Sequence, residues 1–164
     1  MIVEVWIGGE RNRVSGQNEV RKLVERVLNE LESDRPVPIG FHAGAIASFH
    51  VFDVPVGAEI PRFADNALTV GLNRSTGYGG FTWWGEEIAE NPDQAHWVSR
   101  NQDPPILDPR VTADPGYPLW YDRRNVIPMK EVAAVIEEFC FNKGRRPPHI
   151  EWEPGTVNGQ RLDS

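Results

Sequence analysis

The sequence of 164 residues contains a single cysteine, Cys140. One thiol excludes an internal disulfide and any zinc site built from several thiolates, and it is typical of a reducing compartment. No run approaches the roughly 18 apolar residues that a membrane helix requires. The N-terminus has neither the basic nor the apolar region of a secretory signal. We therefore expect a cytoplasmic protein that makes no contact with a membrane.

Basic residues are scarce as well. The chain has 17 lysines and arginines against 24 aspartates and glutamates, a formal net charge of −7. A negative surface repels phosphate backbones and attracts cationic surfaces. Direct binding to nucleic acid is therefore not expected, whereas a partner protein with a basic surface fits the charge. A simpler interpretation also stays open at this stage, namely that the acidic surface only keeps the domain soluble.

Hydrophobic periodicity predicts two amphipathic helices, one near each end of the chain. From Val20 to Leu31 the apolar residues recur at i, i+3, i+4, i+7, i+8 and i+11, a single stripe on one side of a helix. A second stripe follows Pro128 and is ended by Gly144. Alternating or β-branched runs predict strands at 1–7, within 39–54, and at 68–73, 80–85, 119–122 and 149–153.

This order of elements predicts an α+β fold in which an antiparallel meander is packed by the two helices. The length fits one domain, which we place at residues 1–153. Residues 86–118 hold six of the fourteen prolines and few apolar anchors, so we expect a long acidic loop there, with a possible short strand at 96–99. Residues 154–164 are polar, and a frayed tail is expected.

No catalytic or metal-binding set is evident, and no cofactor is expected. His42 and His50 are eight residues apart and Asp53 follows, a spacing unlike the pairings of zinc motifs. Cys140 lies beside Phe139 on the second predicted helix, where a buried thiol behaves as a small hydrophobe. A hydrolase that uses a pair such as His50 and Asp53 remains an alternative.

The clearest functional feature is an acidic stretch between tryptophans. From Gly85 to Pro115 there are seven acids and two bases, which gives five of the seven net negative charges of the chain. Tryptophan is a favoured anchor in interfaces, and complementary charge accelerates docking. The alternative is that the aromatic residues belong to the core while the acids solvate a loop. The residues predicted to contact a partner are Trp84, Glu86, Glu87, Glu90, Asp93, Trp97, Asp103, Asp108 and Trp120.

The C-terminal third resembles a known family. Asn125-Val126-Ile127-Pro128 opens a helix that ends with Phe139, then come Gly144-Arg145-Arg146-Pro147-Pro148 and Ile150-Glu151-Trp152. This ordered set resembles the immunity proteins called Imm family one, which occur in bacterial polymorphic toxin systems. The Thr69–Leu72 strand and the early helix also fit that family's plan. The segments 55–67 and 86–118 look longer than the family pattern.

The resemblance implies an inhibitor that binds a cognate toxin in a stoichiometric complex, commonly a toxin of the nucleic-acid deaminase superfamily. Such toxins act on an extruded or single-stranded base, and an acidic loop between aromatic residues would suit their cationic groove. The family supplies no catalytic residues. Trp152 is expected to be structural, beside Ile136 and Phe139. A module that binds a peptide or small ligand under the long loop is the alternative from another class.

Overall fold

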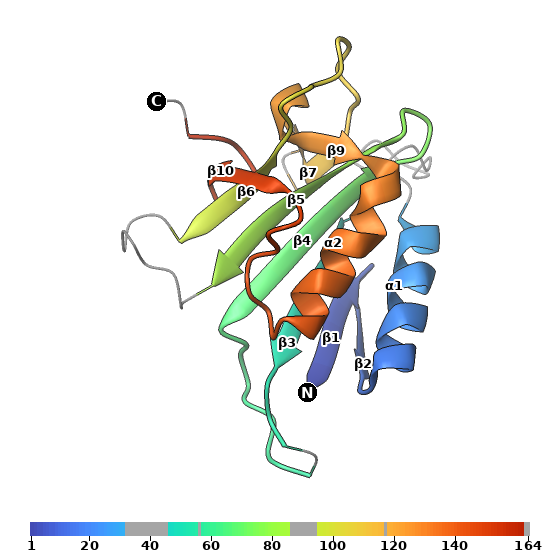
Figure 1. Ribbon diagram of the computed structural model, residues 1–164, viewed down its shortest axis with the longest axis vertical. Helices are drawn as coiled ribbons and strands as arrows, with labels where there is room; N and C mark the ends of the chain where they lie inside the picture. The colour runs from blue at the N-terminus through green and yellow to red at the C-terminus, as the bar shows by residue number, and fades with distance from the viewer. Residues whose placement is uncertain (32–45, 56, 86–94, 117, 163–164) are drawn as a thin grey trace.

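The computed structural model describes residues 1–31, 46–55, 57–85, 95–116 and 118–162. These residues form one sheet of eight strands with both helices on the same face (Figure 1). All its strand pairs are antiparallel, which confirms the predicted α+β class. The strand order is β10-β6-β5-β4-β3-β1-β2, and β9 pairs with one end of β5.

Eight strands build the main sheet, and the central ones are mostly buried. The strands are β1 (Ile2–Ile7), β2 (Glu10–Val14), β3 (Ile46–Phe52), β4 (Asn66–Asn73), β5 (Tyr78–Gly85), β6 (His96–Arg100), β9 (Val126–Pro128) and β10 (Glu151–Pro154). A separate two-stranded sheet joins β7 (Thr112–Asp114) to β8 (Leu119–Trp120), and the short 3-10 helix η1 spans Arg123–Asn125.

Strand β2 was not predicted, because its sequence Glu-Arg-Asn-Arg-Val has almost no apolar residues. Its position is set by the preceding turn. Gly8 and Gly9 both have positive φ, at 57° and 79°, and they join Ile7 to its register partner Glu10. A two-residue hairpin of this kind needs positive φ at both positions, which glycine adopts without strain. The glycine pair therefore makes a hairpin whose second strand is a charged sheet edge.

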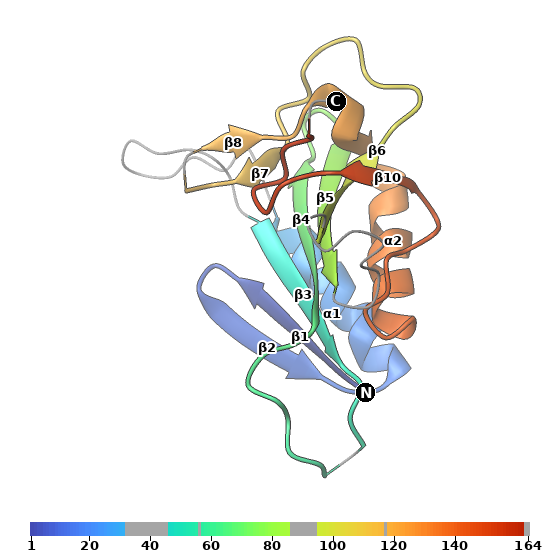
Figure 2. The same ribbon diagram turned by 90° about the vertical axis from the view of Figure 1, so that its left-hand side faces the viewer.

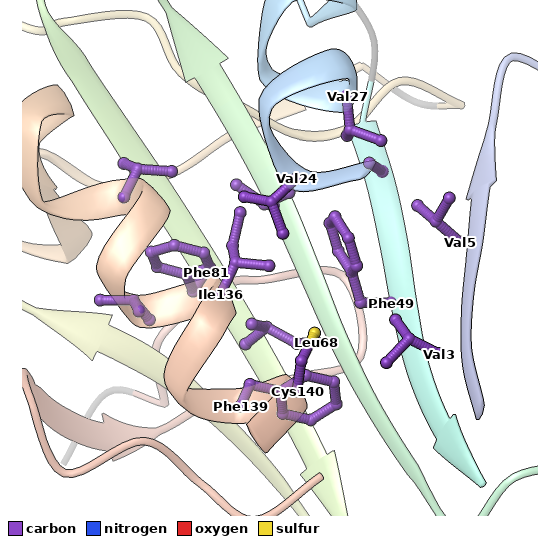
Figure 3. Packing of buried hydrophobic residues seen from close by; sticks show 14 of the residues in the cluster. Val3, Val5, Val24, Val27, Phe49, Leu68, Phe81, Ile136, Phe139 and Cys140 are labelled. Carbon is purple, nitrogen blue, oxygen red and sulfur yellow. The ribbon is translucent and has the colours of Figure 1, made fainter. Parts of the chain in front are cut away.

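The two helices cover one face and form the main core with it. Helix α1 (Gln17–Glu30) and helix α2 (Met129–Phe141) direct the predicted stripes at the sheet. Figure 3 shows Val24 and Val27 of α1 and Ile136 of α2 facing residues of the strands. No helix among the described residues is long and apolar enough to cross a membrane.

A second, smaller core lies on the other face, where β7 and β8 cover one end of the sheet (Figure 2). Two paired glycines of the central strands, Gly71 and Gly80, make this close approach possible. A Cβ on Gly71 would lie 2.0 Å from the carbonyl oxygen of Thr112, and a Cβ on Gly80 would lie 2.5 Å from the ring of Tyr121. Larger residues at these two positions would separate the layers.

The segment 86–118 is not one loop. Residues 96–100 form β6, which lies between β5 and β10 and matches the short strand predicted at 96–99. Residues 112–114 form β7. What remains of the predicted loop, within the described residues, is the connection between β6 and β7. The tail also differs from expectation: Gly155 donates to the carbonyl of His96 at 3.0 Å, and Gly155 bridges to Arg161. Residues 155–162 therefore form a turn that folds back on β10 and also contacts β6 and β8.

Candidate interaction surface

The adjacent tryptophans of β5 point to opposite faces of the sheet, as strand alternation requires. Trp83 is 2% exposed in the main core, and its Nε1 donates to the carbonyl of Gly144 at 3.0 Å. Trp84 is half-buried on the face without helices, opposite His96 in the register of β5 and β6. Of the two, Trp84 is therefore the one that a partner could reach.

Trp97 lies on the helix side, directly across from Trp83. It is half-buried at the edge of the main core, and the guanidinium carbon of Arg146 lies 4.0 Å from the centre of its ring. The same guanidinium lies 5.7 Å from the ring of Trp83. The chain after α2 thus contacts Trp97, and the sheet separates Trp97 from Trp84.

Trp120 belongs to β8 in the small second sheet and is covered by Arg110, whose guanidinium carbon is 4.9 Å from the ring centre. The three tryptophans of the predicted surface therefore occupy three environments and do not form one patch. The predicted contact residues Glu86, Glu87, Glu90 and Asp93 lie outside the described residues. Asp103 and Asp108 are exposed in the connection between β6 and β7.

This connection, residues 101–111, is called the β6–β7 loop below, and it is fixed to the domain at both ends. At its start, the backbone N–H of Asn101 donates to the carbonyl of Arg124 at 2.8 Å. At its end, the carbonyl of Pro109 accepts from Thr76 Oγ1 at 2.8 Å and from Asn73 Nδ2 at 3.1 Å. Asn73 is itself buried at the end of β4. The sheet therefore positions the loop directly.

The tip of the β6–β7 loop exposes two adjacent aliphatic side chains. Ile106 is 90% exposed and Leu107 is 80% exposed. Neither residue was among the predicted contact residues, because the segment is acidic and has few apolar residues. The available indication was the run Pro104-Pro105-Ile106-Leu107-Asp108, in which an apolar pair lies inside a proline-restricted, polar loop. Such an apolar pair in a loop has no periodicity that would assign it to a core.

A family model described as Immunity protein Imm1 matches residues 8–154, which is most of the chain. The chain belongs to the Imm1 immunity protein family. This membership supports a role in immunity against a toxin, the role implied by the resemblance. No curated protein shows significant sequence similarity to the chain.

In this Imm1 protein the residues that carried the resemblance occupy framework positions. Trp152 is half-buried at the edge of the main core, with its ring centre 6.4 Å from that of Phe81 and its Nε1 donating to Pro147 at 2.7 Å. Ile136 and Phe139 are fully buried. These contacts join α2, the segment after it and β10 to the main core.

Glu153 extends this framework to the C-terminal tail. Its Oε1 accepts from Asn125 Nδ2 at 2.9 Å and lies 3.1 Å from Nε of Arg161. The carboxylate therefore joins β10 to the end of η1 and to the tail that folds back. Near the same helix, Asp122 caps η1, and the hydrogen bond from Arg124 is the main reason why the pKa of Asp122 lies below its usual value.

The residues of the hydrolase alternative have separate partners in the Imm1 protein. The imidazole of His50 hydrogen-bonds to Ser48 Oγ at 3.2 Å and to the carbonyl of Asn66 at 2.9 Å. Asp53 pairs with Lys143 at 3.0 Å. His42 lies outside the described residues, and among the described ones no group of three His, Cys, Asp or Glu residues could hold a metal ion.

Cys140 is fully buried in the main core (Figure 3). Burial raises the pKa of its thiol to about 12. The thiolate is the form of cysteine that attacks as a nucleophile or binds a metal, and a thiol with this pKa stays protonated at neutral pH. Cys140 therefore acts as a packing residue of α2.

Proposed function

We propose that this immunity protein protects the cell that makes it by binding its cognate toxin in the cytoplasm, as a one-to-one complex without turnover. The observation that carries the proposal is the combination of family membership with a surface loop that is anchored to the domain and exposes Asp103 and Asp108. An inhibitor needs a preformed surface, because ordering a mobile loop on binding costs free energy.

The partner that suits an acidic surface is a toxin domain with a basic surface, and a nucleic-acid deaminase suits it best. Such an enzyme must hold a polyanionic substrate, so its groove carries positive charge. The stretch 85–115 carries seven acids and two bases, and complementary charge of this kind steers association. The inhibitor itself then contacts no nucleic acid.

The test is to copurify the tagged protein with the product of the neighbouring gene and to titrate the toxin's activity with it. We expect a one-to-one complex, complete inhibition at equimolar ratio, and association that slows as salt rises, since screening weakens steering. A matched variant, Asp103→Asn with Asp108→Asn, keeps the side-chain shapes and should lower the association rate constant more than it raises the dissociation rate constant. Failure of the wild-type protein to bind or inhibit the toxin would refute the proposal.

A second candidate function is a module that binds a peptide or small ligand. It is favoured by one observation, a depression of about 710 Å³ at the end of the sheet where β3 and β5 finish. Asp53, Asn66, Phe63 and Lys143 are among its lining residues. This function would require Asp53 or Asn66 for activity and would be indifferent to the acids of the β6–β7 loop, so the same loop variant separates the two candidates.

A further inference from the structure

We propose that Ile106 and Leu107 are the apolar anchor of the complex, inserted into a nonpolar socket on the toxin, while the acidic residues beside them orient the encounter. This inference rests on the proposed function and names the part of the surface that makes the tightest contact. It differs from an acidic plug, in which the carboxylates would supply most of the affinity.

The first support is exposure that the fold does not explain. Ile106 and Leu107 are 90% and 80% exposed, although they are adjacent and both aliphatic. Single exposed apolar residues are ordinary on protein surfaces, but two that project together offer a partner a joint apolar surface. No two of the other exposed large apolar side chains among the described residues are adjacent in the sequence; these are Trp6, Phe63, Val157 and Leu162.

The second support is that the β6–β7 loop is held in one conformation. Besides the contacts at its two ends, the N–H of Asp103 donates to Asn101 Oδ1 at 2.9 Å, and the N–H of Arg110 donates to Asp108 Oδ1 at 2.9 Å. Arg123 donates to the carbonyl of Ile106 at 3.4 Å. Prolines at 104, 105 and 109 restrict the backbone further. Less conformational entropy is therefore lost when the tip binds.

The third support concerns the chemistry of the partner. Asp103 precedes the apolar pair by three residues and Asp108 follows it directly, and both are exposed. Two exposed bases, Arg110 in the loop and Arg123 beside Ile106, make the charge around the tip mixed. A surface complementary to this tip has a nonpolar depression, with cationic side chains at the positions that face Asp103 and Asp108. A basic groove that holds unstacked bases provides both features, because it combines cations for phosphates with apolar or aromatic walls for bases.

The experiment compares three variants of the full chain for binding to the neighbouring gene's product, by surface plasmon resonance at low and at high salt. Ile106→Ser with Leu107→Ser removes the anchor. Asp103→Asn with Asp108→Asn removes only charge. Val157→Ser is the matched control, because Val157 is apolar and 68% exposed and lies in the C-terminal tail, outside both the β6–β7 loop and the depression that Phe63 lines.

We expect the anchor variant to raise Kd by about a hundredfold or more, mostly through faster dissociation. The charge variant should mainly slow association, and Val157→Ser should leave Kd within about twofold. Because the substituted side chains are exposed, all three variants should unfold at the wild-type temperature. An anchor variant that binds like the wild type, in a complex that the wild type does form, overturns this inference and leaves the proposed function standing. If the wild type forms no complex, both are overturned.

Discussion

Replacing Trp83 by phenylalanine should destabilise the domain far more than the same change at its neighbour Trp84. Trp83→Phe removes the hydrogen bond to Gly144 that ties β5 to the turn after α2. Such a bond contributes about 0.5–1.5 kcal/mol net. The smaller ring also leaves unfilled space in a packed core, at about 1–2 kcal/mol. Together these losses predict a free energy of unfolding lower by about 2–3 kcal/mol.

For a chain of this length, 1 kcal/mol shifts the melting temperature by about 2–4 °C, so Trp83→Phe should melt about 5–10 °C below the wild type. Far-ultraviolet circular dichroism measures this without using tryptophan fluorescence, which the substitution itself changes. Trp84→Phe is the control, because Trp84 is half-buried on the opposite face, and it should cost less than about 1 kcal/mol. Equal losses for the two variants would refute the assignment of Trp83 as the buried member of the pair.

Three further predictions follow from buried groups of the framework. Glu4 is buried, and burial alone would raise its pKa, but hydrogen bonds from Arg13 and Trp6 and the charge of Arg13 outweigh this and lower it from the ordinary 4.5. The ionised carboxylate therefore stabilises the fold above about pH 4.5, and that contribution is lost as the pH falls through the lowered pKa. Urea unfolding between pH 6 and pH 3 should show a smaller acid loss in Glu4→Gln, and parallel curves would contradict the argument. Gly144→Ala should destabilise by about 1–3 kcal/mol in thermal unfolding, because φ is +81° and the new Cβ would lie 2.4 Å from the Asn66 side chain; an unchanged melting temperature would show that this turn is not constrained. The thiol of Cys140 should react with a thiol reagent only after denaturant is added, and fast labelling of the native protein at pH 8 would disprove its burial.

Hydrophobic periodicity in the sequence was sufficient to predict the helices, which bury an apolar stripe, and the strands that bury one face. The stripe that begins at Val20 is helix α1, and the resemblance placed the chain in the correct family. Strand β2 was missed because a charged edge strand carries no apolar alternation, and its pairing depends on the turn at Gly8 and Gly9. The glycine pair was the local indication of this hairpin, whereas the residues of β2 themselves carry none.

The candidate surface was harder to predict for a related reason. Charge counting identified the segment that contains Asp103 and Asp108, but it could not reveal that β6 passes through this segment and divides it. Nor could it show that Trp84 and Trp97 lie on opposite faces, which depends on the register of β5 and β6. The apolar tip at Ile106 and Leu107 becomes visible only when exposure is known.

The contacts of Asn73 and Thr76 with Pro109 have a consequence for how this surface can change. They hold the β6–β7 loop by its backbone carbonyls, and the exposed side chains of Ile106 and Leu107 take no part in that attachment. The tip can therefore vary in sequence while the contacts that hold the loop stay the same. Substitutions at the tip can change which toxin the protein binds at little cost in stability. A substitution at Asn73 would instead release the loop from β4 and so weaken binding, although every exposed side chain of the tip stays the same.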